Sequence, residues 1–389
     1  MPSSAAARSH IVLALWVALA AACAGAPQPA PVGAIARAPF EVDLGGWTSQ
    51  AELVHPAPDG PHGAGPFPTV LLIHGNGPHD MDVTLPGPDG GSKMFQAIAD
   101  HLAARGFAVV RYHKRFVKAP GRFDARFWRE QSTFVFTEDA GKVLDAALAL
   151  PPCDRERIVL YGWSEGTAVA AALAAARGDV DALVLQGVVG LPWRDMVRSW
   201  LLDVALPYAQ SADGTITADS LAVALRGDGG MVAKLGAAFF ADPNAQRRGA
   251  VAVSTLLDQD RDGALDPERE VRPAIEPMLD FAFSPQGNVY VYAEGRAVPV
   301  VPEQAAALRD LPVLVLQGEH DASTPPAGAR AVADAWRAAG GRQVDVVVFP
   351  GLGHTLGPAR SPIDDCGRAI DPAALATVAP WLARITASR

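Results

Sequence analysis

The sequence predicts an α/β fold with a mostly parallel, doubly wound sheet and an inserted, mainly helical cap. Short, continuously apolar runs such as "PTVLLIHG" are typical of strands buried on both faces of a parallel sheet. Helical patterns alternate with such runs over residues 40–190 and again over 310–389. The alternation stops between them, so we expect residues 191–309 to form a cap over the carboxyl edge of the sheet.

The expected elements of the core follow in chain order. From Phe40, "FEVDLGGWTSQAELVHP" predicts a hairpin with Gly45-Gly46 at its turn. A helix over about residues 93–105 ends at Gly106, and the next helix begins at the expected cap Thr137. The other expected strands are "PTVLLIHG", "FAVVRYH", "RIVLYGWSEG", "DALVLQGVV", "PVLVLQGEHD" and "QVDVVVFPG". The other expected helices are "TAVAAALAAAR", "AGARAVADAWRAAG" and residues 372–386.

Length and charge limit the class of protein. The chain has 389 residues, of which 49% are hydrophobic, and this suffices for one large domain with an insertion or for two domains. The formal net charge is −9, and the 33 Lys and Arg residues are spread along the chain without a basic block. We therefore expect no nucleic-acid partner.

The N-terminus has the pattern of an export signal. Residues 1–24 combine a short positive segment, an apolar stretch and small residues, and this stretch is short for a membrane anchor, which needs roughly 20 apolar residues. Cys23 follows three alanines, as in a bacterial lipobox, but Leu19 lies one residue too early. Lipidation of Cys23 and plain cleavage therefore both stay open. Residues 25–39, rich in Pro and Ala, predict a flexible tether. We expect a secreted, periplasmic or lipid-anchored protein.

Two further cysteines, Cys153 and Cys366, complete the set. In an oxidising compartment they are an even pair and suit a disulfide. Two cysteines in so long a chain are equally compatible with two free thiols, so the sequence leaves both states open.

The segment "GWSEG" predicts a nucleophile at Ser164. It matches G-x-S-x-G and lies where an apolar strand ends and an Ala-rich helix begins. Glycines on both sides of the serine allow the sharp turn that presents its hydroxyl above the sheet. The five-residue pattern occurs often by chance, and it is this strand–turn–helix context that makes it specific.

A serine nucleophile needs a base and an acid that orients the base. Of the nine histidines, His354 lies in a glycine-lined loop, "GLGHTLG", after the last expected strand. Asp321 lies just past the carboxyl end of its own strand, in "QGEHDASTPP". We therefore predict that His354 is the base and Asp321 the orienting acid.

The expected oxyanion hole consists of two backbone N–H groups. "HGNG" follows a strand end, and we assign the N–H of Asn76 as one donor. The other is the N–H of Glu165, directly after the nucleophile. The Glu165 carboxylate is either a site for a cationic substrate group or a solvated or ion-paired side chain, and we favour the second interpretation.

These residues together resemble the α/β-hydrolase superfamily, over roughly residues 40–190 and 310–388. The order Ser164, Asp321, His354 is the order of that superfamily. "HGNGPHDMD" resembles the HGSGPxDRD segment of bacterial serine esterases and dipeptidyl-aminopeptidase-like hydrolases, and "RYHKR" is similar to their RYDKR. Met81 replaces Arg and His113 replaces Asp, so we expect no ion pair between these positions. The resemblance implies acyl transfer to water through a Ser-His-Asp triad without a catalytic cofactor.

The expected cap carries a loop that resembles an EF-hand, over residues 258–269. Gly263 occupies the glycine position of the loop. The tentative calcium ligands are Asp258, Asp260, Asp262, the carbonyl of Ala264 and Asp266. Arg269 occupies the twelfth position, where an acid is expected, and Glu268 and Glu270 flank it. An ordinary polar turn is the alternative.

Two features limit the predicted calcium site. We expect Pro273 and Pro277 to shorten any exiting helix, so a full paired EF-hand is not predicted. The expected role of calcium is to stiffen the cap, with an affinity of roughly 10⁻⁴ to 10⁻³ M.

The sequence as a whole predicts an exported serine hydrolase that cleaves carboxylic esters. The cap contains aromatic residues that could line an acyl site or simply pack a core: Trp193, Trp200, Phe239, Phe240, Phe281 and Phe283. One alternative is a serine peptidase or aminopeptidase of the same fold, acting on short peptides. Another is a calcium-dependent binding protein on a catalytically inactive hydrolase scaffold.

Overall fold

A computed structural model describes residues 32–341 and 343–387 of the chain. The expected signal, Cys23 and the tether up to residue 31 lie outside the described residues. The described residues form one compact unit. Within the described ranges, no helix has both the length and the apolar character that crossing a membrane requires.

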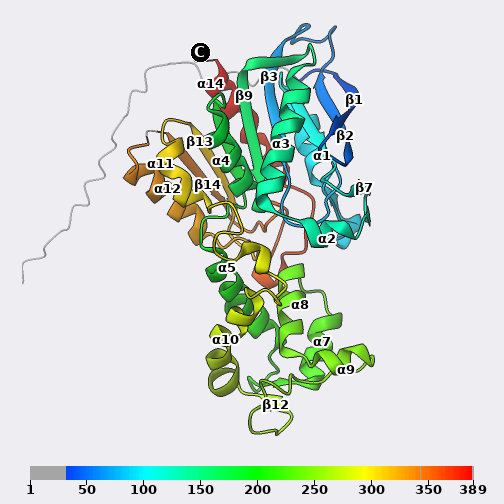
Figure 1. Cartoon of the computed structure of the whole chain (residues 1–389), viewed down its shortest axis with the longest axis vertical. Helices are drawn as coiled ribbons and strands as arrows, with labels where there is room; N and C mark the ends of the chain where they lie inside the picture. Colours follow the sequence, from blue (N-terminus) through cyan, green and yellow to red (C-terminus); the bar gives the residue numbers. More distant parts are fainter. Residues whose placement is uncertain (1–31, 342, 388–389) are drawn as a thin grey trace, which may run out of the picture. The chain divides into compact units, whose positions relative to one another are not determined.

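The core is an eight-stranded sheet in the order β1-β2-β6-β3-β9-β10-β13-β14 (Figure 1). Strand β2 is antiparallel to both of its neighbours, and all other adjacent pairs are parallel. The strands are β1 Ile35–Asp43, β2 Thr48–Pro56, β3 Phe67–Ile73, β6 Ala108–Tyr112, β9 Cys153–Trp163, β10 Ala182–Gln186, β13 Val313–Gly318 and β14 Val344–Phe349. The predicted mostly parallel α/β sheet is confirmed.

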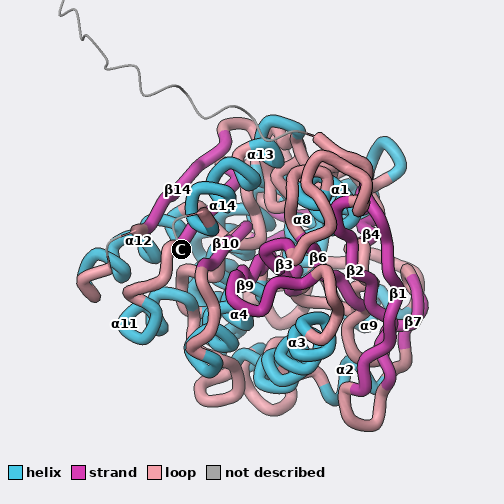
Figure 2. The backbone as a smooth tube through the Cα atoms, turned by 90° about the horizontal axis from the view of Figure 1, so that it is seen from above, coloured by secondary structure: helices cyan, strands magenta, loops and turns pink. Residues whose placement is uncertain are grey.

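Helices cover both faces of the sheet (Figure 2). Val70 and Leu72 of β3 pack on the side of α1 and α14, whereas Leu71 and Ile73 pack on the side of α3 and α4. All four side chains are buried, and this two-sided burial explains the continuous apolar run in the sequence. The helices of the core are α1 Met94–Ala103, α2 Arg126–Glu130, α3 Thr133–Leu148, α4 Glu165–Arg177, α12 Ala327–Ala338, α13 Pro372–Ala376 and α14 Val378–Thr386. The core also contains the short 3-10 helices η1 Pro88–Gly90 and η7 Pro362–Asp364. Two small two-stranded sheets pair β4 Thr84–Leu85 with β5 Ser92–Lys93, and β7 Val117–Ala119 with β8 Arg122–Phe123.

The first strand begins earlier than the sequence predicts. Residues 35–39, expected to belong to the tether, pair with β2 from Ile35 opposite Pro56 to Pro39 opposite Glu52. Proline is tolerated here because β1 is an edge strand and needs no hydrogen bond on its outer side. The boundary between tether and core therefore lies before Ile35, not at Phe40.

Two helix boundaries also differ from the prediction. Helix α3 begins at Thr133, with Ser132 as its N-cap, and the hydroxyl of the expected cap Thr137 instead donates within the helix to the carbonyl of Thr133. The C-terminal helix divides into α13 and α14 at Thr377. Pro380 lacks the N–H that would bond to the carbonyl four residues before it, which favours the break.

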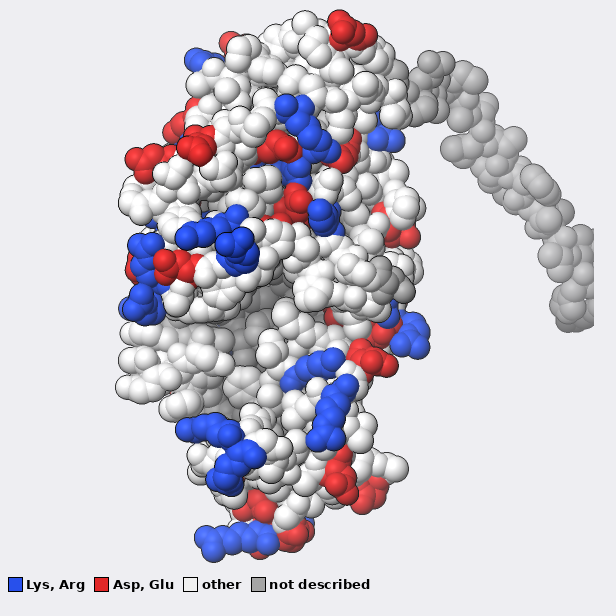
Figure 3. All heavy atoms as spheres, turned by 90° about the vertical axis from the view of Figure 1, so that its right-hand side faces the viewer, with Lys and Arg blue, Asp and Glu red and all other residues white. Residues whose placement is uncertain are grey.

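The insertion is mainly helical and has its own apolar cluster, which includes Leu201, Phe240 and Leu279. Figure 1 shows α5, α7, α8, α9 and α10 grouped beyond one end of the strands. Figure 3 shows a hollow on one face between the insertion and the core. Its elements are α5 Trp193–Ser199, the π-helix η2 Trp200–Ala205, α6 Leu206–Ala209, β11 Ile216–Thr217, α7 Ala218–Arg226, α8 Met231–Ala237, η3 Ala238–Phe240, α9 Pro243–Arg247, β12 Ala264–Leu265, the π-helix η4 Pro267–Val271, α10 Arg272–Ala282, η5 Tyr290–Tyr292, η6 Val301–Gln304 and α11 Ala305–Leu308.

Candidate active site

Ser164 lies in a strained turn between β9 and α4. Its φ of 57° and ψ of −127° are rare for a residue with a side chain. A Cβ at Gly162 would lie 2.3 Å from the carbonyl oxygen of Gly166, and a Cβ at Gly166 would lie 2.2 Å from that of Ile73. The turn therefore excludes a side chain at both flanking positions, which is the physical basis of the G-x-S-x-G pattern here.

Asp321 and His354 form a buried hydrogen-bonded pair. The distance from His354 Nδ1 to Asp321 Oδ2 is 2.9 Å. Asp321 Oδ1 accepts the backbone N–H groups of Ser323 at 2.9 Å and Thr324 at 2.8 Å, which fix the carboxylate. Burial is the largest single influence and lowers the pKa of His354, but the charge of Asp321, the hydrogen bond to Asp321 and the charge of Asp365 together raise this pKa above its usual value. The imidazole is thus oriented and made more basic.

The loop of Ser164 lies against this pair. The indole N–H of Trp163 donates to the carbonyl of His354 at 3.2 Å, and the two rings are 5.2 Å apart. Gly187, at φ 58°, packs so closely that a Cβ would lie 2.8 Å from His354 Nδ1. Among the described residues the Ser164 hydroxyl makes no hydrogen bond to His354; such bonds often tighten only when substrate binds.

Asn76 and Glu165 are adjacent, as the predicted oxyanion hole requires. The Asn76 side-chain amide donates to Glu165 Oε2 at 3.4 Å, and a Cβ at the neighbouring Gly75 would lie 2.9 Å from the Cβ of Ser164. Glu165 opens α4, so its N–H has no partner within the helix. The Asn76 N–H has no hydrogen-bond partner in the described part of the chain. Both N–H groups are therefore available next to the nucleophile.

Comparison with known proteins assigns the family. A family model described as "alpha/beta hydrolase fold" matches residues 68–357. The chain belongs to the α/β-hydrolase fold family.

Individual relatives are more distant or match only in part. Esterase EstD of Thermotoga maritima is 53% identical over 55 residues, which is 14% of this chain and 12% of EstD. The structure of a proline iminopeptidase from Mycobacterium smegmatis is similar with a TM-score of 0.51 at 18% identity, covering 90% of this chain and 99% of that one. Est1E from Butyrivibrio proteoclasticus has a TM-score of 0.47 at 15% identity, covering 90% and 99%.

Beside the candidate triad lies a buried polar network that was not predicted from the sequence. Lys114 Nζ donates to the carbonyl of Gly75 at 2.7 Å and to Glu165 Oε1 at 3.2 Å. The hydroxyl of Tyr292, from the insertion, donates to Glu165 Oε2 and accepts from the side-chain amide of Asn76. Burial lowers the pKa of Lys114, and burial together with the charge of Glu165 raises the pKa of Tyr292. The Glu165 carboxylate is thus ion-paired, the interpretation favoured from the sequence.

The only sequence signal for this network was the position of Lys114 within "RYHKR". Tyr292 lies in the irregular insertion, where no periodicity marks it. Its ring stacks on Trp193 with centroids 4.1 Å apart, so one of the cap aromatics supports the network from the insertion side. By contrast, Phe240 is buried in the insertion's own core and Phe281 is exposed. The six cap aromatics therefore do not form a single lining.

The two departures from the family pattern meet in the structure. The backbone N–H of Met81 donates to His113 Nδ1 at 2.9 Å. Burial lowers the pKa of His113, which favours the neutral ring that this bond requires. A neutral hydrogen bond thus connects two positions between which we expected no ion pair.

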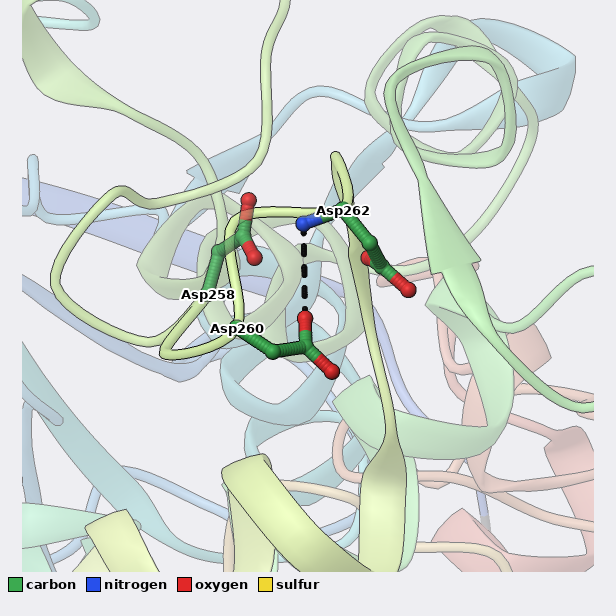
Figure 4. A group of neighbouring side chains, drawn as sticks. All are labelled: Asp258, Asp260 and Asp262. Atoms are coloured by element: carbon green, nitrogen blue, oxygen red, sulfur yellow. Dashed lines mark hydrogen bonds between the residues drawn. The ribbon is translucent and has the colours of Figure 1, made fainter.

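Three of the predicted calcium ligands converge. Asp258, Asp260 and Asp262 offer carboxylate oxygens that all lie within 4.8 Å of one another (Figure 4). The N–H of Gly263 donates to Asp258 Oδ2 at 3.1 Å, while Asp258 Oδ1 is buried without a hydrogen-bond partner among the described residues. Hard oxygen donors in this arrangement suit calcium.

Two other acids of the loop, Asp266 and Glu270, have other hydrogen-bond partners. Asp266 caps η4 by accepting the N–H groups of Glu268 and Arg269, both at 2.9 Å. Glu270 is buried and accepts the N–H groups of Gln259 at 2.7 Å and Asp266 at 2.8 Å. The predicted ligand Asp266 and the flanking acid Glu270 therefore bind backbone N–H groups.

The helix that leaves the loop is longer than expected. The π-helical η4 leads directly into α10, which continues through Pro277 to Ala282. Pro273 lies at the junction of η4 and α10, and Pro277 lies within α10. The expectation that the two prolines shorten this helix is wrong.

Both remaining cysteines are free thiols in the structure. Cys153 is buried, and burial raises its pKa to about 11. The Cys366 thiol donates to the carbonyl of Asp228, in the insertion, at 3.3 Å. Of the two states left open by the sequence, the structure has separate thiols.

Proposed function

We propose that this α/β hydrolase is a serine hydrolase that cleaves carboxylic esters. The observation that carries the proposal is the buried 2.9 Å hydrogen bond between His354 and Asp321, held against the strained turn of Ser164. Ser164 Oγ attacks the ester carbonyl while His354 accepts its proton, and Asp321 keeps the imidazole in the tautomer with a free Nε2. The same imidazole then returns the proton to the departing alkoxide.

The oxyanion of each tetrahedral intermediate binds the backbone N–H groups of Asn76 and Glu165. These donors are held in place before reaction, so they stabilise the developing charge without reorganisation. Water, deprotonated by His354, then releases the acid from Ser164 and restores the enzyme.

Ester cleavage is favoured over aminopeptidase activity by the state of Glu165. An aminopeptidase needs an available carboxylate to bind the substrate's α-amino group. Glu165 already contacts Lys114 and Tyr292 and is almost fully buried, so its charge is neutralised within the protein. The local identity to a protein named an esterase also supports an ester substrate. The likeness to a proline iminopeptidase concerns the fold alone.

The test is a panel of p-nitrophenyl esters of different acyl length, measured beside aminoacyl p-nitroanilides. We expect ester turnover that exceeds anilide turnover and disappears in Ser164→Ala. Faster cleavage of anilides than of esters would favour the peptidase alternative. If neither substrate class is turned over, the other alternative, a calcium-dependent binding protein on a catalytically inactive scaffold, becomes the preferred interpretation.

We further propose that calcium binds at Asp258, Asp260 and Asp262 and stiffens the insertion without taking part in the chemistry. The expected affinity is weak, roughly 10⁻⁴ to 10⁻³ M. Calorimetry should detect binding, and a chelator should lower Tm, with both effects absent in Asp260→Ala. The absence of binding heat together with an unchanged Tm in chelator would refute the site.

We also propose that the enzyme is exported, as its first residues predict, and acts on small-molecule esters at the cell envelope or outside it. Mass spectrometry of the mature protein distinguishes the two forms of processing. A mass increased by acyl chains on Cys23 indicates lipid anchoring, and an unmodified shortened chain indicates simple cleavage. Recovery of the full-length chain from the cytoplasm would contradict export.

A further inference from the structure

A second buried carboxylate, Asp365, lies beside the Asp321–His354 pair. It belongs to the loop that follows η7. Its two oxygens accept the backbone N–H of His354 at 3.1 and 3.0 Å, and Oδ2 also accepts the backbone N–H of Ala322 at 3.1 Å. Ala322 directly follows Asp321. One carboxylate therefore bonds to the loop of the acid and to the loop of the base.

Close packing fixes this carboxylate. A Cβ at Gly353 would lie 2.2 Å from Asp365 Oδ1, so the Asp365 carboxylate occupies the space that a side chain at position 353 would take. On the insertion side, a Cβ at Gly230 would lie 2.1 Å from the carbonyl oxygen of Asp365. The backbone of Asp365 is thus confined between the insertion and the loop of His354.

The charges that face Asp365 belong to the proposed catalytic pair. Among the described residues no Lys or Arg forms an ion pair with it, whereas the neighbouring Asp364 is paired with Arg360 and Arg368. Burial, and then the charge of Asp321, raise the pKa of Asp365 to about 6, while His354 acts in the opposite direction. The negative charge of Asp365 in turn contributes to the raised pKa of His354.

We propose that Asp365 is a positioning residue for the ester hydrolysis proposed above: its carboxylate ties the loop of Asp321 to the loop of His354 and keeps acid and base in register. Asp365 does not touch the substrate and transfers no proton. It acts through the placement of the imidazole and through its charge beside that imidazole. Sequence reasoning missed it because an acid in an irregular loop matches no motif.

The test compares Asp365→Asn with Asp364→Asn, which makes the same charge change one position earlier but affects an ion pair instead of the two loops. Asn keeps the shape of the side chain but presents an amide to one of the two N–H donors. We expect kcat to fall about 10- to 100-fold in Asp365→Asn with little change in KM, because the base is displaced. The acidic limb of kcat/KM against pH should also move to lower pH, since a negative charge beside His354 is lost. Asp364→Asn should show neither change.

The outcomes separate this proposal from the proposed function. Absence of ester hydrolysis in the unaltered enzyme would refute the function itself. An active enzyme in which Asp365→Asn matches Asp364→Asn in kcat, KM and pH profile would overturn only the role of Asp365. If Asp365→Asn does not fold, NMR of the unaltered enzyme decides. The amide resonances of Ala322 and His354 should follow the titration of the Asp365 carboxyl together, and independent behaviour of the two amides would overturn the proposal.

Discussion

The buried ion pair between Lys114 and Glu165 predicts how much stability is lost when Lys114 is replaced. Lys114 is the only cation found to pair with Glu165 in the described part of the chain. The two side chains are 4% and 3% exposed, so water screens neither charge. Removing one partner of a buried pair costs about 3–5 kcal/mol, because the other charge stays buried and unpaired. Glu165 keeps the hydroxyl of Tyr292 and the amide of Asn76 as hydrogen-bond donors. We therefore expect Lys114→Met to lower the free energy of unfolding by about 3 kcal/mol, the lower end of that range.

The assay is urea unfolding at pH 7 of four proteins: the unaltered enzyme, Lys114→Met, Glu165→Gln and the double variant. The double variant removes both charges, so it should lose clearly less stability than the sum of the single variants. The slope of the free energy against urea should stay the same, as expected for a change in stability alone. Strictly additive losses would show that the two groups do not interact and would refute this reasoning.

Two further predictions concern His354 and Tyr292. The imidazole of His354 must be neutral to accept the proton from Ser164, and its pKa is raised above the usual 6.5. We therefore expect kcat/KM to fall as pH decreases, with a midpoint above 6.5. A midpoint below 6.5 would contradict the role of Asp321. Tyr292→Phe keeps the ring that stacks on Trp193 but removes the hydroxyl from a carboxylate, so it should lower the free energy of unfolding by about 1.5–3 kcal/mol in the same urea assay. An unchanged stability would show that this hydroxyl is not bonded to Glu165 in solution.

The core of the fold and the candidate triad were predictable because local chemistry determines them. A strand buried on both faces must be continuously apolar, as β3 is, and the turn at Ser164 leaves no room for a side chain at Gly162 or Gly166. The loops after β13 and β14 then bring Asp321 and His354 together, because parallel strands end at the same edge of the sheet. Each of these features is visible in a short stretch of sequence.

The features that were missed depend on contacts between distant segments. Tyr292 reaches Glu165 across 127 positions, and nothing in the irregular sequence around it indicates this contact. Pro39 looks unsuited to a strand until the structure shows that β1 lies at the edge of the sheet. The path of α10 through Pro277 likewise follows from tertiary packing, which overrides the local preference of proline.

The central claim is that Ser164 is an activated nucleophile, and reaction with a fluorophosphonate tests it most directly. Such a reagent phosphonylates a serine hydroxyl only where a base removes its proton and an oxyanion hole receives the charge. Intact-mass spectrometry should show one added phosphonyl group per chain, located on the peptide that contains Ser164, and no addition in Ser164→Ala. An unlabelled enzyme, or equal labelling of Ser164→Ala, would contradict the account.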